Sequence, residues 1–202
     1  MPEQKRLSLA GIGCGSRTRT YMKLAMEQKN RYRIAAAADP VKQRTEAVRD
    51  FAPEEERDSV RLFKDAASLL AEPRLADVAI IGTQDDYHYA PCRKAMELGY
   101  HVLKRRVAVC HVLRYTQFYR TLKKIIDSGE IGEVITFNAN EGVGAWHFAH
   151  SFVRGHWGNS KTSTPMIVAK CCHDMDILYW LMGRRKCLSV ASFGELTFFT
   201  KK

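Results

Sequence analysis

Short apolar runs alternate with longer amphipathic segments through the first half of the chain. The runs at 7–12, 32–38 and 78–81 have the length of buried strands and predict three of them. Helices between successive strands produce right-handed crossovers and a parallel sheet. The pattern therefore predicts an α/β fold with a Rossmann-type, doubly wound parallel sheet, with helices at 18–28, 41–51, 66–70 and 87–98.

The second half of the chain shows a weaker version of this pattern. Strands are expected at 134–140, 188–192 and 196–199, and helices at 118–127 and 165–181. The sequence thus predicts two domains. Because an incomplete sheet leaves unpaired edge groups, we expect a homo-oligomer formed through the C-terminal sheet. The two domains are a dinucleotide-binding domain at 1–114 and part of an α/β substrate domain with an open sheet at 115–202.

The end of the first domain contains an anomaly. Residues 100–103 and 106–113 both have the pattern of strands, and only Lys104 and Arg105 separate them. Parallel neighbours need a crossover of roughly a dozen residues or more, and a two-residue hairpin favours Gly or Asn. Either a segment is deleted at 103–104, or residues 100–113 form one long, kinked strand.

The first predicted strand runs into a glycine-rich turn. Gly13 and Gly15 would let the backbone turn sharply and approach a pyrophosphate, while the next helix directs its amide groups at the phosphates. The pattern Gly-x-Gly-x-x-Gly is incomplete, since its third glycine is Ser16 when read from Gly11 and Thr18 when read from Gly13. The alternative is an ordinary glycine-rich loop of an α/β domain.

Asp39 ends the second predicted strand, where a carboxylate can accept both ribose hydroxyls of an adenosine and would repel a 2′-phosphate. NAD is therefore favoured over NADP. The residues expected to bind the cofactor in this region are Gly13, Gly15, Ser16, Arg17 and Asp39.

A polar turn at 82–88 follows the third predicted strand. Ligands of doubly wound sheets bind at the carboxyl ends of strands, so Thr83 and His88 are also expected beside the cofactor. The alternative is that His88 only caps or lines the next helix.

Three polar residues recur at a spacing of three on the predicted helix 165–181: Lys170, His173 and Asp176. Residues at this spacing share a helix face, so an ammonium, an imidazole and a carboxylate would converge on one cleft. We expect His173 to be the base that removes a hydroxyl proton and Lys170 to stabilise the developing alkoxide. The alternatives are a polar network on the helix surface and a metal held by His173 and Asp176. No third ligand accompanies that pair, so we expect no metal.

The segment 146–157 combines aromatic side chains, histidines and an arginine. Trp146 can stack on the apolar face of a sugar and Arg154 can donate hydrogen bonds, so both are expected to bind substrate. His147 and His150 at helical spacing could instead bind a metal, and a partly buried apolar loop is a further alternative.

Composition narrows the function classes. The 202 residues are 46% hydrophobic and carry a formal net charge of +10, but the basic residues are scattered, so we expect no nucleic-acid partner. No apolar run is long enough to span a membrane. Six cysteines form no Cys-x-x-Cys pair, and we find no export signal, so reduced thiols and a cytoplasmic location are expected.

Several segments together are shared with one known family: Gly13-Cys-Gly-Ser-Arg17, Ala38-Asp-Pro40, Gly82-Thr-Gln-Asp-Asp-Tyr-His88, Ala95-Met-Glu-Leu-Gly-Tyr-His-Val-Leu103 and Lys170-Cys-Cys-His-Asp-Met-Asp176. In these segments the chain resembles the Gfo/Idh/MocA oxidoreductases, which include glucose-fructose oxidoreductase and inositol dehydrogenase. The resemblance implies an N-terminal Rossmann domain, a C-terminal α/β domain and NAD(P)-dependent oxidation or reduction of sugars, polyols or related compounds.

Three features depart from the family pattern. Family members follow the His-Val-Leu strand with Glu-Lys-Pro, whose lysine lies beside nicotinamide and substrate, whereas this chain continues with Lys104-Arg-Arg106. The family's aspartate four residues before His173 is Ala169 here, and Lys170 would take its place. The chain is also shorter than is usual in the family.

The sequence thus predicts an NAD(P)-dependent oxidoreductase that transfers a hydride between a nicotinamide cofactor and a sugar, polyol or related carbohydrate. One alternative is a non-catalytic, dinucleotide-binding remnant that lacks the Glu-Lys-Pro segment. A second is an enzyme that cleaves glycosides through a transient, NAD-dependent oxidation.

Overall fold

The computed structural model describes residues 5–28, 30–102, 110–183 and 185–195. The chain divides into two compact units, an N-terminal unit (Met1–Ala108) and a C-terminal unit (Val109–Lys202). The sequence-based boundary was placed between residues 114 and 115, so the segment 110–114 lies in the C-terminal unit of the structure.

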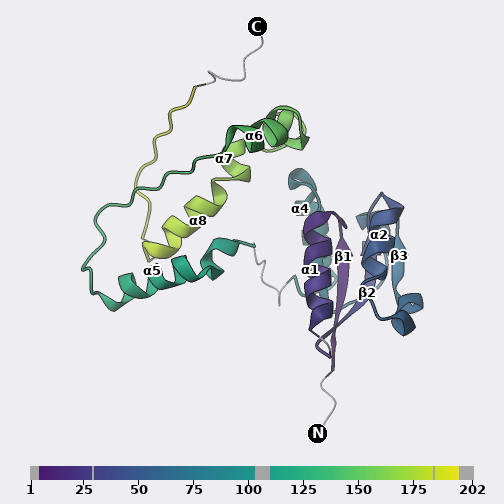
Figure 1. The fold of residues 1–202 in the computed structure, drawn as a ribbon. Coiled ribbons are helices and arrows are strands. Elements are labelled where there is room, and N and C mark those ends of the chain that lie inside the picture. The colour runs from purple at the N-terminus through teal and green to yellow at the C-terminus, as the bar shows by residue number, and fades with distance from the viewer. Residues whose placement is uncertain (1–4, 29, 103–109, 184, 196–202) are drawn as a thin grey trace. The chain divides into compact units, whose positions relative to one another are not determined.

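The N-terminal unit is built on a four-stranded parallel sheet (Figure 1). Its spatial order is β3-β2-β1-β4, with the strand order reversing between β1 and β4. The Rossmann-type, doubly wound sheet is therefore confirmed, and the short third strand is an addition to the prediction. The strands are β1 (Leu7–Ile12), β2 (Tyr32–Ala38), β3 (Arg61–Phe63) and β4 (Val78–Ile81).

The helices of this unit follow the predicted order. A capping box in which Asp65 accepts from the amide of Ser68 starts the third of them. They are α1 (Ser16–Glu27), α2 (Lys42–Arg49), α3 (Ala66–Leu70) and α4 (Tyr89–Glu97), with short 3-10 turns at η1 (Glu54–Ser59) and η2 (Asp85–Tyr87).

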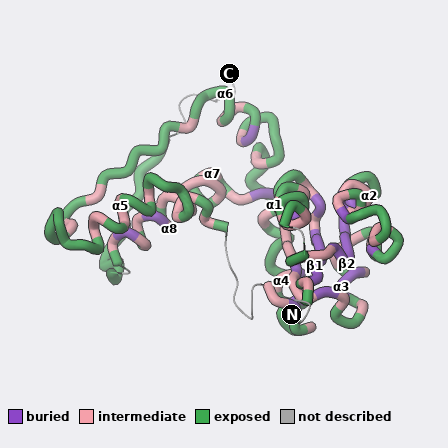
Figure 2. The backbone as a smooth tube through the Cα atoms, turned by 60° about the horizontal axis from the view of Figure 1, so that its bottom comes forward, coloured by how far each residue is buried: buried purple, intermediate pink, exposed green. Residues whose placement is uncertain are grey.

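Two apolar clusters cover the two faces of the sheet. Along β1, Ala10 and Ile12 pack in one cluster while Leu9 packs in the other, as the alternation of side chains along a strand requires. Figure 2 shows the buried residues gathered in β1, β2 and the helices beside them. Burial on both faces explains why these strands are continuous apolar runs in the sequence.

The predicted strand at 100–103 is wrong in the described residues. Only His101 pairs, in an isolated bridge with Val78, while the buried Tyr100 accepts a hydrogen bond from the amide of Leu75 through its hydroxyl. The junction at 103–104 and the first half of the predicted strand 106–113 lie outside the described residues. The described remainder of that segment leads into a 3-10 turn, η3 (Val112–Tyr115).

The regular elements in the described part of the C-terminal unit are all helices or helical turns. A single helix was predicted at 165–181, but a turn at Lys170 and Cys171 interrupts it, and the chain continues as a separate helix. The elements after η3 are α5 (Gln117–Ser128), α6 (Ala145–Phe148), a π-helical turn η4 (Ala149–Val153), a 3-10 turn η5 (His156–Gly158), α7 (Met166–Ala169) and α8 (Cys172–Leu181).

The strands predicted at 134–140 and 188–192 are wrong. Both segments lack strand pairing, and most of their apolar side chains face solvent, with Ile135 83% and Leu188 89% exposed. An extended segment becomes a strand only when a neighbour satisfies its amide and carbonyl groups, and the described part of this unit provides no such neighbour. The predicted strand at 196–199 lies outside the described residues.

Within the part of the chain that the structure describes, no helix has the length and apolar character needed to cross a bilayer.

Candidate functional site

The glycine-rich turn brings the carboxyl ends of β1 and β4 into close contact. Gly13 has a φ of +75°, and a Cβ at this position would lie 2.7 Å from the amide nitrogen of Thr83. A Cβ on Gly82 would lie 2.2 Å from Oγ1 of Thr18. Gly13 is therefore required by its own backbone conformation and by the backbone of Thr83, whereas a side chain on Gly82 would collide with the buried side chain of Thr18. The two glycines build the crevice where the strand order reverses, the ligand position of doubly wound sheets.

Gly15 differs from both of these glycines. It is the N-cap residue of α1, and a Cβ built on it meets no atom within 4 Å. Ser16 and Arg17 in the first turn of the helix are exposed. Open space in front of free amide groups at the start of a twelve-residue helix fits a pyrophosphate. The residues predicted on this turn thus fit a bound dinucleotide.

Asp39 lies beside the same turn but is only 5% exposed. One carboxylate oxygen accepts the amide of Cys14 at 2.8 Å, and the other accepts the amide of Val41 at 2.8 Å. Arg44 forms an ion pair with it at 3.7 Å. The sequence predicted a ribose acceptor here, and the structure gives this carboxylate a task that the prediction missed, which is to tie the end of β2 to the glycine-rich turn.

Cys14, inside the turn, is a structural group. Its side chain is fully buried and its thiol approaches the carbonyl of Ala38 at 3.5 Å. Burial, followed by the negative charge of Asp39, raises the pKa of this thiol to about 12. A thiol that stays protonated is a poor nucleophile, so Cys14 contributes packing rather than chemistry.

Thr83 and His88, both predicted as cofactor neighbours, contact each other. The hydroxyl of Thr83 lies 2.7 Å from Nδ1 of His88 and 3.0 Å from the carbonyl of Tyr87, to which it donates. A hydroxyl has a single hydrogen, so Nδ1 of His88 is the donor in the first contact. His88 also occupies the N-cap position of α4 without a side-chain capping bond, so it does not cap that helix as the alternative proposed.

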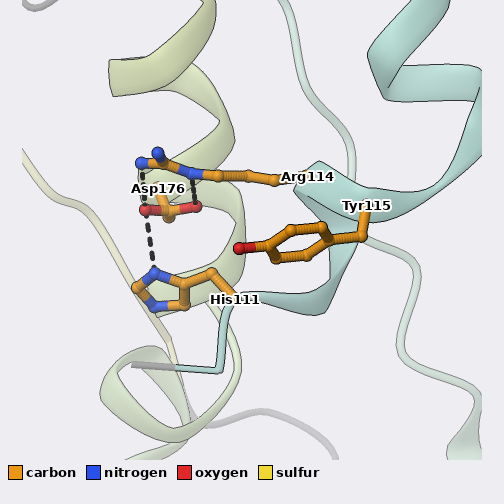
Figure 3. Close-up of a pocket in the computed structure, with 4 residues that line it drawn as sticks. All are labelled: His111, Arg114, Tyr115 and Asp176. Carbon is orange, nitrogen blue, oxygen red and sulfur yellow. Dashed lines mark hydrogen bonds and ion pairs between the residues drawn. The ribbon is translucent and has the colours of Figure 1, made fainter. Parts of the chain in front are cut away.

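In the C-terminal unit, Asp176 on α8 is the centre of a polar cluster (Figure 3). The guanidinium of Arg114 donates two hydrogen bonds of 2.6 Å, one to each carboxylate oxygen. Nδ1 of His111 lies 2.8 Å from Oδ1 of the same carboxylate. His111 precedes η3 and Arg114 lies on it, so residues far apart in sequence meet here.

Electrostatics fix the charge of this cluster. Burial disfavours the charged form of Asp176, but the hydrogen bonds from Arg114 and His111 and the positive charge of Arg114 outweigh it and lower the pKa of Asp176 below its usual 3.8. Bonding to Asp176 raises the pKa of Arg114. The carboxylate and the guanidinium are therefore both charged at neutral pH.

The three predicted catalytic residues do not converge on one point. His173 packs edge to face on His111, with ring centroids 5.4 Å apart, and its Nδ1 is buried without a hydrogen-bond partner in the described residues. His173 and Asp176 thus both contact His111. Lys170 precedes the first residue of α8, and its ammonium instead lies 2.7 Å from Nε2 of His147.

Sequence reasoning missed His111 and Arg114. A possible signal is the His-x-x-Arg-Tyr pattern just before the helix that became α5. Together with Tyr115 and Asp176 they line an open pocket of about 230 Å³, and Tyr115 turns its hydroxyl end toward the other three side chains (Figure 3).

The predicted substrate residues lie on the segment that contains α6 and η4. Trp146 is 76% exposed and stacks on His150, with parallel rings and centroids 5.7 Å apart. Arg154 is exposed at the end of η4. His147 and His150 therefore contact Lys170 and Trp146 respectively, and the described residues contain no group of three metal-ligating side chains.

These features define a dinucleotide-binding α/β protein with a polar site on a second unit. Residues 7–104 match the family model described as the oxidoreductase family, NAD-binding Rossmann fold, and residues 123–194 match the C-terminal alpha/beta domain of the same family. The chain belongs to the Gfo/Idh/MocA family of oxidoreductases, and its N-terminal unit is the family's NAD-binding Rossmann domain.

Curated relatives include two inositol 2-dehydrogenases. The enzyme of Burkholderia multivorans is 25% identical over 200 residues, which are 88% of this chain and 55% of that protein. The enzyme of Burkholderia vietnamiensis is 33% identical over 92 residues, 46% of this chain and 24% of that protein. The chain thus spans about half the length of the Burkholderia multivorans enzyme.

Solved structures show the same fold. The scyllo-inositol dehydrogenase of Lactobacillus casei with bound NAD(H) and scyllo-inositol superposes with a TM-score of 0.66 at 17% identity, covering 89% of this chain and 57% of that chain. The myo-inositol dehydrogenase of Lactobacillus casei in complex with NAD(H) and myo-inositol gives 0.61 at 20% identity, with 89% and 55% covered.

Proposed function

We propose that this chain is an NAD-dependent oxidoreductase that transfers a hydride between the nicotinamide and a sugar or polyol, with cyclic polyols of the inositol type as the first candidates. The observation that carries the proposal is the membership of an oxidoreductase family in both units, together with a glycine-rich turn that leaves open space at the start of α1. The inositol dehydrogenases among the relatives supply the substrate class.

The N-terminal unit would hold the cofactor with the residues that the sequence predicted. Gly13 and Gly15 admit the pyrophosphate to the amides of α1, and the exposed Ser16 and Arg17 supply donors and a positive charge. Asp39 holds the turn in shape and faces the adenosine ribose, and Thr83 and His88 line the crevice from the β4 side. The bound nicotinamide supplies the hydride acceptor.

Oxidation of an alcohol also needs a group that accepts the hydroxyl proton. The C-terminal unit places two imidazoles edge to face, His173 and His111, beside the carboxylate of Asp176. We assign the role of proton acceptor to this pair, of which the sequence analysis predicted His173. Lys170 keeps its proposed role of stabilising the alkoxide, from a position in which its ammonium contacts His147.

The exposed Trp146 and Arg154 would bind the polyol. An indole face packs against the C–H groups of a ring polyol, and a guanidinium donates hydrogen bonds to its hydroxyls. Trp146 is stacked on His150, which covers one face of the indole and limits its rotation, so the other face would contact the polyol.

Titration of the purified chain with NADH and NADPH, followed by energy transfer from tryptophan to the nicotinamide, tests the cofactor. Saturable binding of NADH is expected, with NADPH weaker, and the Gly15→Ala variant should bind less tightly. The absence of saturable binding to either cofactor would overturn the proposal.

Turnover of myo-inositol, scyllo-inositol and simple sugars with NAD tests the reaction. Reduction of NAD by any of these supports the dehydrogenase. Binding of the cofactor without turnover on any substrate would favour a non-catalytic protein, and release of aglycone from glycosides alone would favour redox-assisted glycoside cleavage.

A further inference from the structure

The segment 142–173 of the C-terminal unit contains no aspartate and no glutamate, although the whole chain has 22 acidic residues. This segment forms α6, η4, η5 and α7. Its ionisable side chains, apart from two cysteines, are cations or histidines: Arg154, Lys161, Lys170, His147, His150, His156 and His173. A surface that carries charges of one sign attracts ligands of the opposite sign. The segment is therefore suited to an anionic ligand.

Two of these cations are not neutralised by the chain itself. In the described part of the C-terminal unit, the side chains that pair with a carboxylate are His111, Arg114, Lys123 and Arg185. Lys170 and Arg154 are not among them. Their positive charges thus remain available to a ligand, as far as the described residues extend.

The ammonium of Lys170 is held in place by an imidazole. It lies 2.7 Å from Nε2 of His147, and because an ammonium can only donate hydrogen bonds, Nε2 is the acceptor. His147 belongs to α6, whereas Lys170 directly follows α7, so this bond also joins the two helices. One of the three ammonium hydrogens is used in this way. The other two are left for a bound molecule.

The residues of α6 and η4 place an aromatic ring and a guanidinium in one row. Trp146, His150 and Arg154 follow one another at intervals of four residues, and residues at this spacing share a helix face. The parallel rings of Trp146 and His150 agree with this for the first two. An indole face and an exposed guanidinium in one row suit a ligand that combines an apolar ring face with an anionic group.

We propose that the substrate is a sugar or polyol ring that carries an anionic substituent, a carboxylate or a phosphate, which Arg154 and Lys170 bind while the ring packs on the free face of Trp146. This inference rests on the proposed oxidation of a polyol and narrows its substrate class. A guanidinium donates two parallel, charge-assisted bonds to a carboxylate or phosphate, and a neutral hydroxyl offers no such partner. Neutral rings should therefore bind more weakly than ring acids of the same size.

Calorimetric titration of the full chain in the presence of NADH compares acids with their neutral counterparts. The pairs are D-glucuronate with D-glucose, D-galacturonate with D-galactose, and D-glucose 6-phosphate with D-glucose. At least one acid should bind about tenfold more tightly than its counterpart, and the better of carboxylate and phosphate identifies the substituent. Equal affinities within all three pairs, or no binding of any acid, would overturn the proposal. So would acetate that binds as tightly as the ring acids, because the ring would then not be recognised.

Variants connect this preference to the two cations. Arg154→Gln keeps a hydrogen-bond donor but removes the charge, so it should weaken the binding of the acid about tenfold and that of the neutral sugar much less. Lys170→Gln should also reduce the preference. Lys161→Gln is the matched control, since Lys161 is exposed in the same segment but is not part of the row, and it should change neither affinity. A preference for the acid that stays complete in Arg154→Gln and Lys170→Gln would contradict the assignment.

Fluorescence quenching measures the local charge without any sugar or cofactor. Trp146 is 76% exposed, and its contribution is the part of the quenching that the Trp146→Phe variant loses. Relative to N-acetyltryptophanamide, the anion iodide should quench this part more than the cation caesium does, and Arg154→Gln should reduce the difference. Stronger relative quenching by caesium would overturn the proposal.

Turnover separates this inference from the proposed function. Oxidation of neutral inositols by NAD, with ring acids neither bound nor oxidised, would support the proposed function and overturn the anionic substrate. Tight binding of a ring acid without reduction of NAD by any compound would support the anionic ligand and overturn the proposed reaction.

Discussion

The amide of Cys14 donates a 2.8 Å hydrogen bond to Oδ2 of Asp39, joining the glycine-rich turn after β1 to the residue that ends β2. The other oxygen of Asp39 accepts the amide of Val41 and so shapes the start of α2. The acidic residue of the dinucleotide site therefore holds together the loops that form that site, in addition to any contact with a ribose.

Removing this carboxylate should cost stability as well as cofactor binding. Asp39→Ala leaves the buried amide of Cys14 without an acceptor, and we expect a loss of roughly 1–3 kcal/mol in the free energy of unfolding. Asp39→Asn keeps one acceptor oxygen and should lose less. Urea unfolding of both variants, compared with NADH titration, measures the two effects. Unchanged stability in Asp39→Ala would show that the hydrogen bonds from the amides of Cys14 and Val41 contribute nothing to the free energy of unfolding.

The two glycines of the turn should respond differently to the same substitution. Gly13→Ala forces a side chain onto a φ of +75° and against the backbone of Thr83, so we expect a loss of at least about 1–2 kcal/mol in stability. Gly15→Ala adds a methyl group to open space and should leave unfolding unchanged, yet weaken NADH binding because that space is where the pyrophosphate would lie.

Thermal unfolding and NADH titration of both variants decide between these expectations. If Gly15→Ala binds NADH as tightly as the unsubstituted chain, the pyrophosphate does not approach the start of α1. If Gly13→Ala is as stable as the unsubstituted chain, the turn can rearrange, and the glycine is not required by the backbone.

The sequence predicted the sheet of the N-terminal unit because its strands are buried on both faces. β1 and β4 are short apolar runs, and such runs are typical of strands that are buried on both faces. β3 was missed because it has three residues and begins with the exposed Arg61. The apolar residues of 134–140 fitted a strand equally well, but strand formation depends on a partner, which local pattern does not reveal.

The candidate active site was only partly predictable, for a related reason. Spacing placed His173 and Asp176 on one face of a helix, and they do share α8. It could not reveal that a turn at Lys170 interrupts the helix, nor that Asp176 would meet Arg114, which lies 62 residues away. Contacts of this kind depend on tertiary packing.

Ser8 and Asp77 allow a test of the link between β1 and the start of β4. The hydroxyl of Ser8 donates a 2.6 Å bond to Asp77, and together with the amide of Ser8 it lowers the pKa of that carboxyl below 3.8. Ser8→Ala should raise the pKa of Asp77 toward 3.8 and cost about 1 kcal/mol at neutral pH. Because the folded-state pKa is depressed, this stabilisation is present above 3.8 and is lost as the pH falls through the folded value.

Carbon-detected NMR titration of the Asp77 carboxyl measures the shift in pKa, and urea unfolding measures the stability. Ser59→Ala is the matched control, since the exposed Ser59 donates only to the carbonyl of Glu56. An unaltered pKa of Asp77 in Ser8→Ala would contradict the expected contribution of the hydroxyl.

The fork between Arg114 and Asp176 should make the stability of the C-terminal unit depend on pH. Arg114→Ala removes two charge-assisted bonds from a largely buried carboxylate, so we expect a loss of roughly 1.5–3 kcal/mol at pH 7. Arg114→Lys keeps the charge but cannot form two parallel bonds, and should lose part of this. Since the pKa of Asp176 is lowered on folding, the contribution is complete above 3.8 and disappears as the pH falls through the folded-state value.

Urea unfolding of these variants at neutral and at acidic pH, followed by tryptophan fluorescence, measures the dependence. The exposed Arg120 on α5 supplies the control, because Arg120→Ala should change stability by no more than about 0.5 kcal/mol. Arg114 also lies over the ring of Trp180, 5.6 Å from its centroid, and this contact does not depend on the charge of Asp176. A loss in Arg114→Ala that is the same at both pH values would therefore assign the stabilisation to the indole contact. The hydrogen bonds between Arg114 and Asp176 would then contribute nothing to the free energy of unfolding.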